Sequence, residues 1–204
     1  MARPDWHANP KPRENTPWLD RYAHLLKRGS LVLDLGCGTG DDAFELASAR
    51  CRVVALEISL DRLIQVPEHP GIIGRVIGDL EHPLPICDGC VDLVHASLSL
   101  HYFTTPTTER IIGDIARVLR DGGVLLCRVN AEGDWNFGYG AGTEVEPNVF
   151  RQPEGHLKRF YTPQMLDHFL RPCFSDVIID RRTIIQNGRE KQTLECVCRK
   201  RLTI

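Results

Sequence analysis

Several features that would suggest a membrane or nucleic-acid protein are missing from this 204-residue sequence. It has no apolar run near the roughly 20 residues needed to cross a bilayer. Residues 1–17 contain four prolines and no apolar core of a secretory signal, so we interpret them as a polar arm. Lysine and arginine total 25 against 27 acidic residues, which disfavours a nucleic-acid partner. We expect a cytoplasmic protein without a membrane partner.

The eight cysteines lack the spacing of a metal site. Cys87 and Cys90 have CxxC spacing, but no second CxxC or HxxxH accompanies them. The other six lie in a glycine-rich loop, beside apolar runs or in a strand-like segment. Because free cysteine is commonly buried, we expect buried thiols throughout and no metal.

Apolar strand-like segments alternate with helical patterns along most of the chain. Strands are predicted at 31–35, 52–56, 72–77, 91–95 and 124–129, and helices at 18–27, 41–49, 60–66, 107–119 and 163–170. Two further strands, 177–180 and 193–199, form a hairpin through Asn187 and Gly188. This order predicts one α/β domain over 1–204, with a Rossmann-like, doubly wound, seven-stranded sheet that is mostly parallel and ends in an antiparallel hairpin.

Residues 131–161 interrupt this rhythm. They are rich in glycine and aromatic residues and carry little periodicity. A connection of this length is either disordered or functional, and we interpret it as an inserted substrate lid.

A glycine loop follows the first predicted strand. Gly36, Gly38 and Gly40 allow the backbone to approach a ligand closely. Asp41 and Asp42 follow directly, and their carboxylates would repel a diphosphate at this helix start. A ligand that carries an ammonium and a sulfonium group fits Asp34 and this acidic rim better.

Acidic residues also follow the next two predicted strands. Glu57 ends the second strand and suits the hydroxyls of a ribose, and Asp79 follows the third. The carboxyl ends of parallel strands are where open α/β sheets bind ligands, so these positions predict a nucleoside-like ligand.

These motifs together resemble those of the class I S-adenosylmethionine-dependent methyltransferases. The similar segments are LDLGCGTG, VVALEIS, GDLEHPLPICDGCVDLVHA and ARVLRDGGVLLCRV, which lie within residues 30–130. The resemblance implies S-adenosylmethionine as cofactor and S-adenosylhomocysteine as product. It also implies cofactor contacts from Asp34, Gly36, Cys37, Gly38, Gly40, Glu57, Ile58, Asp79, Leu80 and Ser97.

The acceptor side is predicted from the ends of later strands and from the lid. The candidate catalytic residues are His101, Tyr102 and Arg128, and the candidate substrate residues are Asn130, Trp135, Tyr139, Arg159 and Tyr161. The family's Asn/Asp-Pro-Pro-aromatic motif is missing after the fourth strand, which disfavours adenine or cytosine methylation. Residues 140–148 and 156–161 resemble small methyltransferases of the tellurite-resistance type.

Two readings of the basic residues stay open. If Arg128, Lys158 and Arg159 converge, they suit an anionic acceptor. Alternatively, Arg159 pairs with Glu144 or Glu146 and only pins the lid.

The sequence therefore predicts a methyltransferase for a small-molecule acceptor with an O, N or S nucleophile, acting as a monomer or homodimer. A protein or RNA methyltransferase is the first alternative, for which a basic face or an extra domain is expected. A non-catalytic cofactor-binding module is the second. A NAD-dependent reductase is disfavoured by the glycine spacing and by the paired aspartates.

Overall fold

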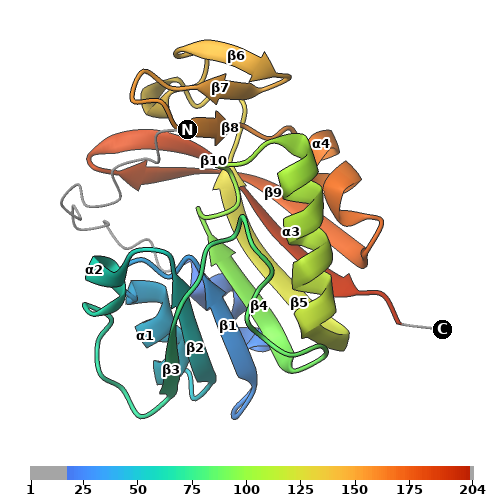
Figure 1. Cartoon of the computed structure of the whole chain (residues 1–204). Coiled ribbons are helices and arrows are strands. Elements are labelled where there is room, and N and C mark those ends of the chain that lie inside the picture. The colour runs from blue at the N-terminus through green and yellow to red at the C-terminus, as the bar shows by residue number, and fades with distance from the viewer. Residues whose placement is uncertain (1–17, 203–204) are drawn as a thin grey trace.

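The computed structural model describes residues 18–202, so the predicted arm at 1–17 lies outside the described part (Figure 1). The strands of the main sheet are β1 (Leu31–Leu35), β2 (Arg52–Glu57), β3 (Ile72–Ile77), β4 (Val91–Ser97), β5 (Leu119–Asn130), β9 (Phe174–Gln186) and β10 (Arg189–Lys200). The helices are η1 (Leu19–Leu25), α1 (Asp41–Ser48), α2 (Leu60–Leu63), α3 (Thr105–Val118), η2 (Trp135–Phe137) and α4 (Pro163–Leu170).

The seven strands form one sheet in the order β3-β2-β1-β4-β5-β10-β9. The pairs from β3 through β5 are parallel, whereas β10 pairs antiparallel with both β5 and β9. The predicted fold class is confirmed. The order reverses at β1 and β4, and the carboxyl ends of these strands therefore flank the crevice where such sheets bind ligands.

Helices cover both faces of the sheet. Leu33 and Leu35 of β1 face the core shared with α3 and α4, while Val32 faces the core shared with η1 and α1. Successive strand side chains point to opposite faces, so each buried strand needs apolar residues at nearly every position. This explains the unbroken apolar runs of the sequence.

The predicted helix at 18–27 is a 3₁₀ helix, η1, that closes over the sheet. Trp18 is 1% exposed and packs against His95 of β4, with ring centroids 5.1 Å apart. From the same segment, Arg21 and Tyr22 both donate to the buried carboxylate of Glu195 in β10. The N-terminal segment is thus tied to the sheet by an aromatic side chain and a buried acid.

The predicted lid contains secondary structure that the sequence did not indicate. β6 (Thr143–Glu146), β7 (Val149–Arg151) and β8 (Leu157–Arg159) form a separate antiparallel sheet, at the top of Figure 1. Edge-to-face contacts among Tyr139, Phe150 and Phe160 hold it together, with centroids 5.4–6.0 Å apart. Strands of only three or four residues are too short to show a clear periodicity in the sequence.

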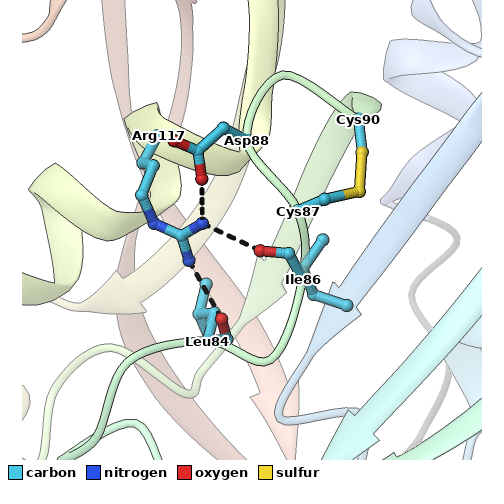
Figure 2. Close-up of a disulfide and its surroundings, with 6 residues drawn as sticks. All are labelled: Leu84, Ile86, Cys87, Asp88, Cys90 and Arg117. Carbon is cyan, nitrogen blue, oxygen red and sulfur yellow. Dashed lines mark hydrogen bonds and ion pairs between the residues drawn. A yellow bond between two sulfur atoms is a disulfide. The ribbon is translucent and has the colours of Figure 1, made fainter.

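The prediction that every cysteine is a buried thiol is wrong for one pair. Cys87 and Cys90 lie exposed in the turn before β4 and form a disulfide. Figure 2 shows this turn beside Arg117 of α3, which donates to the carbonyl oxygens of Leu84 and Ile86. The spacing of a CxxC turn brings two sulfurs together without a metal. The expectation of buried thiols did not take this possibility into account.

The other six cysteines are free, and all but the half-buried Cys173 are buried, as predicted. Within residues 18–202 no cluster of histidine, cysteine and acidic side chains has the arrangement of a metal site. In the same range no helix is long and apolar enough to cross a membrane.

Candidate active site

One cavity of about 850 Å³ opens at the carboxyl ends of the parallel strands, beneath the small sheet. Gly36, Gly38, Glu57 and Asp79 line one end, and residues of the lid and of the β9–β10 hairpin line the other. This volume lies within the range of small-molecule and cofactor sites.

The glycine loop lines the acidic end and depends on positive backbone angles. Gly36 has φ +74°, and a Cβ there would lie 2.5 Å from the Cβ of Ser99. Gly38 has φ +59° and faces open space. The loop also brings Cys37 to the cavity, where burial and then Asp34 and Glu57 raise the pKa of its thiol. These effects favour the protonated thiol of Cys37 at neutral pH.

Glu57, at the end of β2, anchors this loop. Its Oε2 accepts from the backbone N–H of Gly38 at 2.9 Å, and its Oε1 accepts from Ile58 and Ser59 at 3.0 and 3.1 Å. A carboxylate has about four acceptor positions, so one remains for a hydroxyl of a ligand. The side chain lines the cavity, and its contact with a ribose stays a prediction.

Ile58, Asp79 and Leu80 also line the cavity, as predicted. Asp79 Oδ1 accepts from the backbone N–H of Glu81 at 2.9 Å, which fixes the carboxylate at the rim. The carbonyl oxygen of Leu80 accepts from Arg110 of α3, so the loop is tied to a helix.

Two predicted cofactor contacts lie outside the cavity lining. Asp34 is 1% exposed, and its Oδ1 lies 2.6 Å from Nδ1 of His95. Gly40 begins α1, where a Cβ would contact the side chain of Val66. That these two residues contact the cofactor, which for Asp34 could be through a water, stays a prediction. Both stabilise the loop from behind.

Arg128 does not reach the cavity either. It shares the face of β5 that carries Val124 and Leu126, and its guanidinium lies 4.6 Å from the ring centroid of Trp18. Its Nη2 donates to Ser97 Oγ at 2.9 Å. Ser97 itself lines the cavity, so Arg128 reaches the site through Ser97 and through its charge, which lowers the pKa of Lys191.

Three of the predicted acceptor residues do line the cavity, namely His101, Tyr102 and Asn130. His101 is 2% exposed and Asn130 is 0% exposed. His101 and Tyr102 follow Leu98, whose φ of +56° is unusual for a leucine and marks a constrained turn after β4, whereas Asn130 ends β5.

The predicted lid residues serve the lid itself. Arg159 Nη2 lies 3.1 Å from Glu146 Oε2 and donates to Thr105 Oγ1, so the pinning alternative is confirmed. The Tyr161 hydroxyl donates to the Leu100 carbonyl, and Tyr139 packs among lid aromatics. Trp135 is 72% exposed. None of these four lines the cavity, since their side chains hold the lid sheet and its base.

The residues that line the lid end of the cavity were, apart from Lys158, not predicted from the sequence. Lys191 of β10, Phe137, Arg151 and His156 line the lid end together with Lys158. The signal for Lys191 was present, because Lys191, Thr193 and Glu195 place three polar side chains on a buried face of β10. The β9–β10 hairpin brings this strand beside β5, which residue spacing alone does not reveal.

The cavity residues fit S-adenosylmethionine. The ligand carries a ribose diol, an adenine amine and two positive groups, and Glu57, Asp79 and Asp41 offer three carboxylates along the same wall. A loop with Gly38 facing open space leaves room for the ligand chain. The architecture and this wall define a nucleoside-binding α/β protein.

Comparison with known proteins finds a methyltransferase-domain match over part of the chain. Residues 32–123 match the family described as a methyltransferase domain. The chain is 33% identical over 105 residues to malonyl-[acyl-carrier protein] O-methyltransferase from Pectobacterium atrosepticum, which covers 52% of this chain and 40% of that protein. It is 36% identical over 114 residues to an uncharacterised methyltransferase of Synechocystis, covering 53% and 51%. The chain thus spans about half the length of these curated relatives.

Solved structures share the fold. A SAM-dependent methyltransferase from Methanosarcina mazei superposes with a TM-score of 0.75 at 20% identity, covering 93% of this chain and 99% of that one. The 1,6-didemethyltoxoflavin-N1-methyltransferase of Burkholderia thailandensis, solved with S-adenosylhomocysteine, gives 0.66 at 20% identity, covering 89% and 75%. The matched domain and the shared fold support the predicted resemblance to the class I S-adenosylmethionine-dependent methyltransferases and S-adenosylmethionine as the cofactor. The similarity to the tellurite-resistance type stays a prediction.

Proposed function

We propose that this chain transfers the methyl group of S-adenosylmethionine to a small-molecule acceptor held under the lid. One observation carries the proposal. A single cavity runs from the carboxylates Glu57 and Asp79 to His101 and Lys158 beneath the lid. A donor and a small acceptor therefore fit in one shared cavity, with the turn after β4 between them.

The residues of this chain supply position and exclusion of water. When bound, S-adenosylmethionine supplies the electrophilic methyl and its own leaving group. Glu57 and Asp79 would accept hydrogen bonds from the ribose and the adenine amine. Ser97 and Leu98 would form the wall at the point of transfer, and the lid would cover the acceptor. Fixing two reactants in line is the main part of such catalysis.

The lining of the lid end also suits an acceptor with negative charge. Lys158 is the one member of the predicted basic cluster at the cavity, and Lys191 and Arg151 join it. The relative from Pectobacterium acts on a malonyl group carried by a protein. An O nucleophile on an anionic small molecule is the acceptor type that these side chains favour. Cytoplasmic location and a monomeric or homodimeric state remain predictions.

The test is transfer of a labelled methyl group from S-adenosylmethionine into a cell extract that is then separated by size. We expect label in the small-molecule fraction with the wild type and with the exposed-site control Glu109→Gln, and none with Glu57→Ala. Label confined to the protein or RNA fraction would contradict the proposal. So would absence of transfer by a wild type that binds S-adenosylhomocysteine.

A further inference from the structure

The lid end of the cavity contains two lysines, of which one pairs with a buried carboxylate. Nζ of Lys191 lies 3.1 Å from Oδ2 of Asp134 and 4.3 Å from the ring centroid of Phe137. Lys158 donates to the carbonyl oxygen of Phe137. Asp134 is 1% exposed and also accepts from the backbone N–H of Gln192. Among the described residues only Lys191 forms an ion pair with Asp134, and Lys158 senses Asp134 and Glu154 without an ion pair to either, so its ammonium group can still pair with an anionic ligand.

Burial keeps these ammonium groups poorly solvated. Lys191 is 3% exposed, and burial lowers its pKa to about 8 even though Asp134 opposes the change. Burial likewise lowers the pKa of Lys158, against Asp134 and Glu154. A desolvated cation binds an oxyanion more strongly than a surface lysine does.

A second set of polar atoms lies nearer the strand ends. Asn130 is fully buried, and neither its Oδ1 nor its Nδ2 has a hydrogen-bond partner among the described residues. The same holds for Nδ1 of His101. Buried polar groups are rarely left unmatched, so these atoms indicate a polar ligand group beside them.

His101 is held as a neutral imidazole. Burial sets its pKa well below the ordinary value, and Lys191, Lys158 and His156 lower it further. The groups that face it are Lys191 from β10, Lys158 and His156 from the lid, and the ring of Tyr102 at 4.3 Å. A neutral imidazole can accept a proton, and a base is required only if the nucleophile begins protonated.

We propose that the acceptor carries two separate groups, an oxyanion bound by Lys158 and Lys191 and a hydroxyl presented to His101 and Asn130. This inference rests on the proposed function. The oxyanion itself is a poor nucleophile when two ammonium groups hold it. It also carries no proton for the neutral His101 to accept. Nδ1 of His101 takes the hydroxyl proton while the oxygen bonds to the methyl carbon. The carbon–sulfur bond breaks with its electron pair going to sulfur, and the imidazolium then releases its proton to solvent.

The binding half is tested without turnover. Protein saturated with S-adenosylhomocysteine is titrated calorimetrically with 4-hydroxybenzoate and with its uncharged counterpart 4-hydroxybenzamide, and separately with inorganic phosphate. We expect the two oxyanions to bind and the amide to bind about tenfold more weakly or not at all. Lys191→Met and the less buried Lys158→Met should each weaken oxyanion binding about tenfold, and the exposed control Lys27→Met should not.

The catalytic half is tested with any hydroxy acid that is methylated. His101→Gln should lower kcat by about a hundredfold, change KM little and remove the acidic limb of the pH–rate profile. The inference would be overturned by equal binding of 4-hydroxybenzoate and 4-hydroxybenzamide or by unaltered oxyanion binding in both lysine variants. An unchanged pH–rate profile in His101→Gln would also overturn it. Retained S-adenosylhomocysteine binding shows that a variant is folded. If the wild type does not bind S-adenosylhomocysteine, the result counts against the proposed function and not against this inference alone.

Discussion

The Oδ1 atom of Asp34, two residues before the glycine loop, lies 2.6 Å from Nδ1 of His95 in β4, and both side chains are buried. On the other side of the ring, Nε2 of His95 lies 3.7 Å from Oδ2 of Asp42. Burial alone lowers the pKa of His95, but Asp34 and then Asp42 more than offset this and raise it. The imidazolium thus joins β1, β4 and the start of α1 behind the cofactor end of the cavity.

Stability should therefore depend on pH through His95. The folded protein binds a proton more tightly than the unfolded chain, so this stabilisation is complete below the unfolded pKa near 6.5. It is lost as pH rises through the folded pKa. Asp34→Asn should cost about 3 kcal/mol at pH 6 and less at pH 9, as measured by urea unfolding. A difference that is constant with pH, or one matched by Glu109→Gln, would show that His95 is not the proton-binding group.

The lid should detach when its buried ion pair is removed. Burial favours the neutral form of Glu146, but hydrogen bonds from Thr105 and the charge of Arg159 outweigh it and lower the pKa of the carboxyl. Glu146→Gln leaves Arg159, 1% exposed, without its charge partner and should destabilise the lid by about 1–3 kcal/mol. Limited proteolysis should then cut faster within residues 131–161, while affinity for S-adenosylhomocysteine stays within about twofold. Wild-type protease resistance in this variant would contradict the anchoring role.

The disulfide should stabilise only the turn that contains it. It closes a turn of sequence separation 3, and Arg117 holds the same turn through Leu84, Ile86 and Asp88. Replacing Cys87 and Cys90 with serine should cost about 2 kcal/mol or less, because a short loop loses little entropy when it is closed. After mild reduction of the folded protein, a thiol reagent should label these two cysteines first, since the other six are free and mostly buried. Rapid labelling of Cys127 or Cys196 would contradict the described core.

The acidic end of the site could be predicted from sequence because its residues lie at strand ends. Glu57 and Asp79 follow apolar runs directly, so strand limits alone bring them to one edge. Arg128 and Asn130 have the same position in sequence terms, yet only Asn130 lines the cavity. The difference is that Trp18, more than a hundred residues earlier, covers Arg128.

The residues at the acceptor end of the cavity were harder to predict from the sequence, for a related reason. Lys191 belongs to the last strand and reaches the cavity through an antiparallel pairing with β5. Arg159 was the predicted substrate residue, but its guanidinium pairs with Glu146 and holds the lid instead. Side-chain direction and long-range pairing decide such cases, and neither follows from local periodicity.

The cofactor assignment is tested most directly by calorimetric titration with S-adenosylhomocysteine. Glu57 bonds the Gly38 backbone and lines the cavity, so its carboxylate supports both the loop and the ligand. The wild type should bind one equivalent, with affinity reduced at least about a hundredfold in Glu57→Ala and retained in Glu109→Gln. NAD should not compete. Absence of S-adenosylhomocysteine binding by the folded wild type, or undiminished binding by Glu57→Ala, would contradict the account.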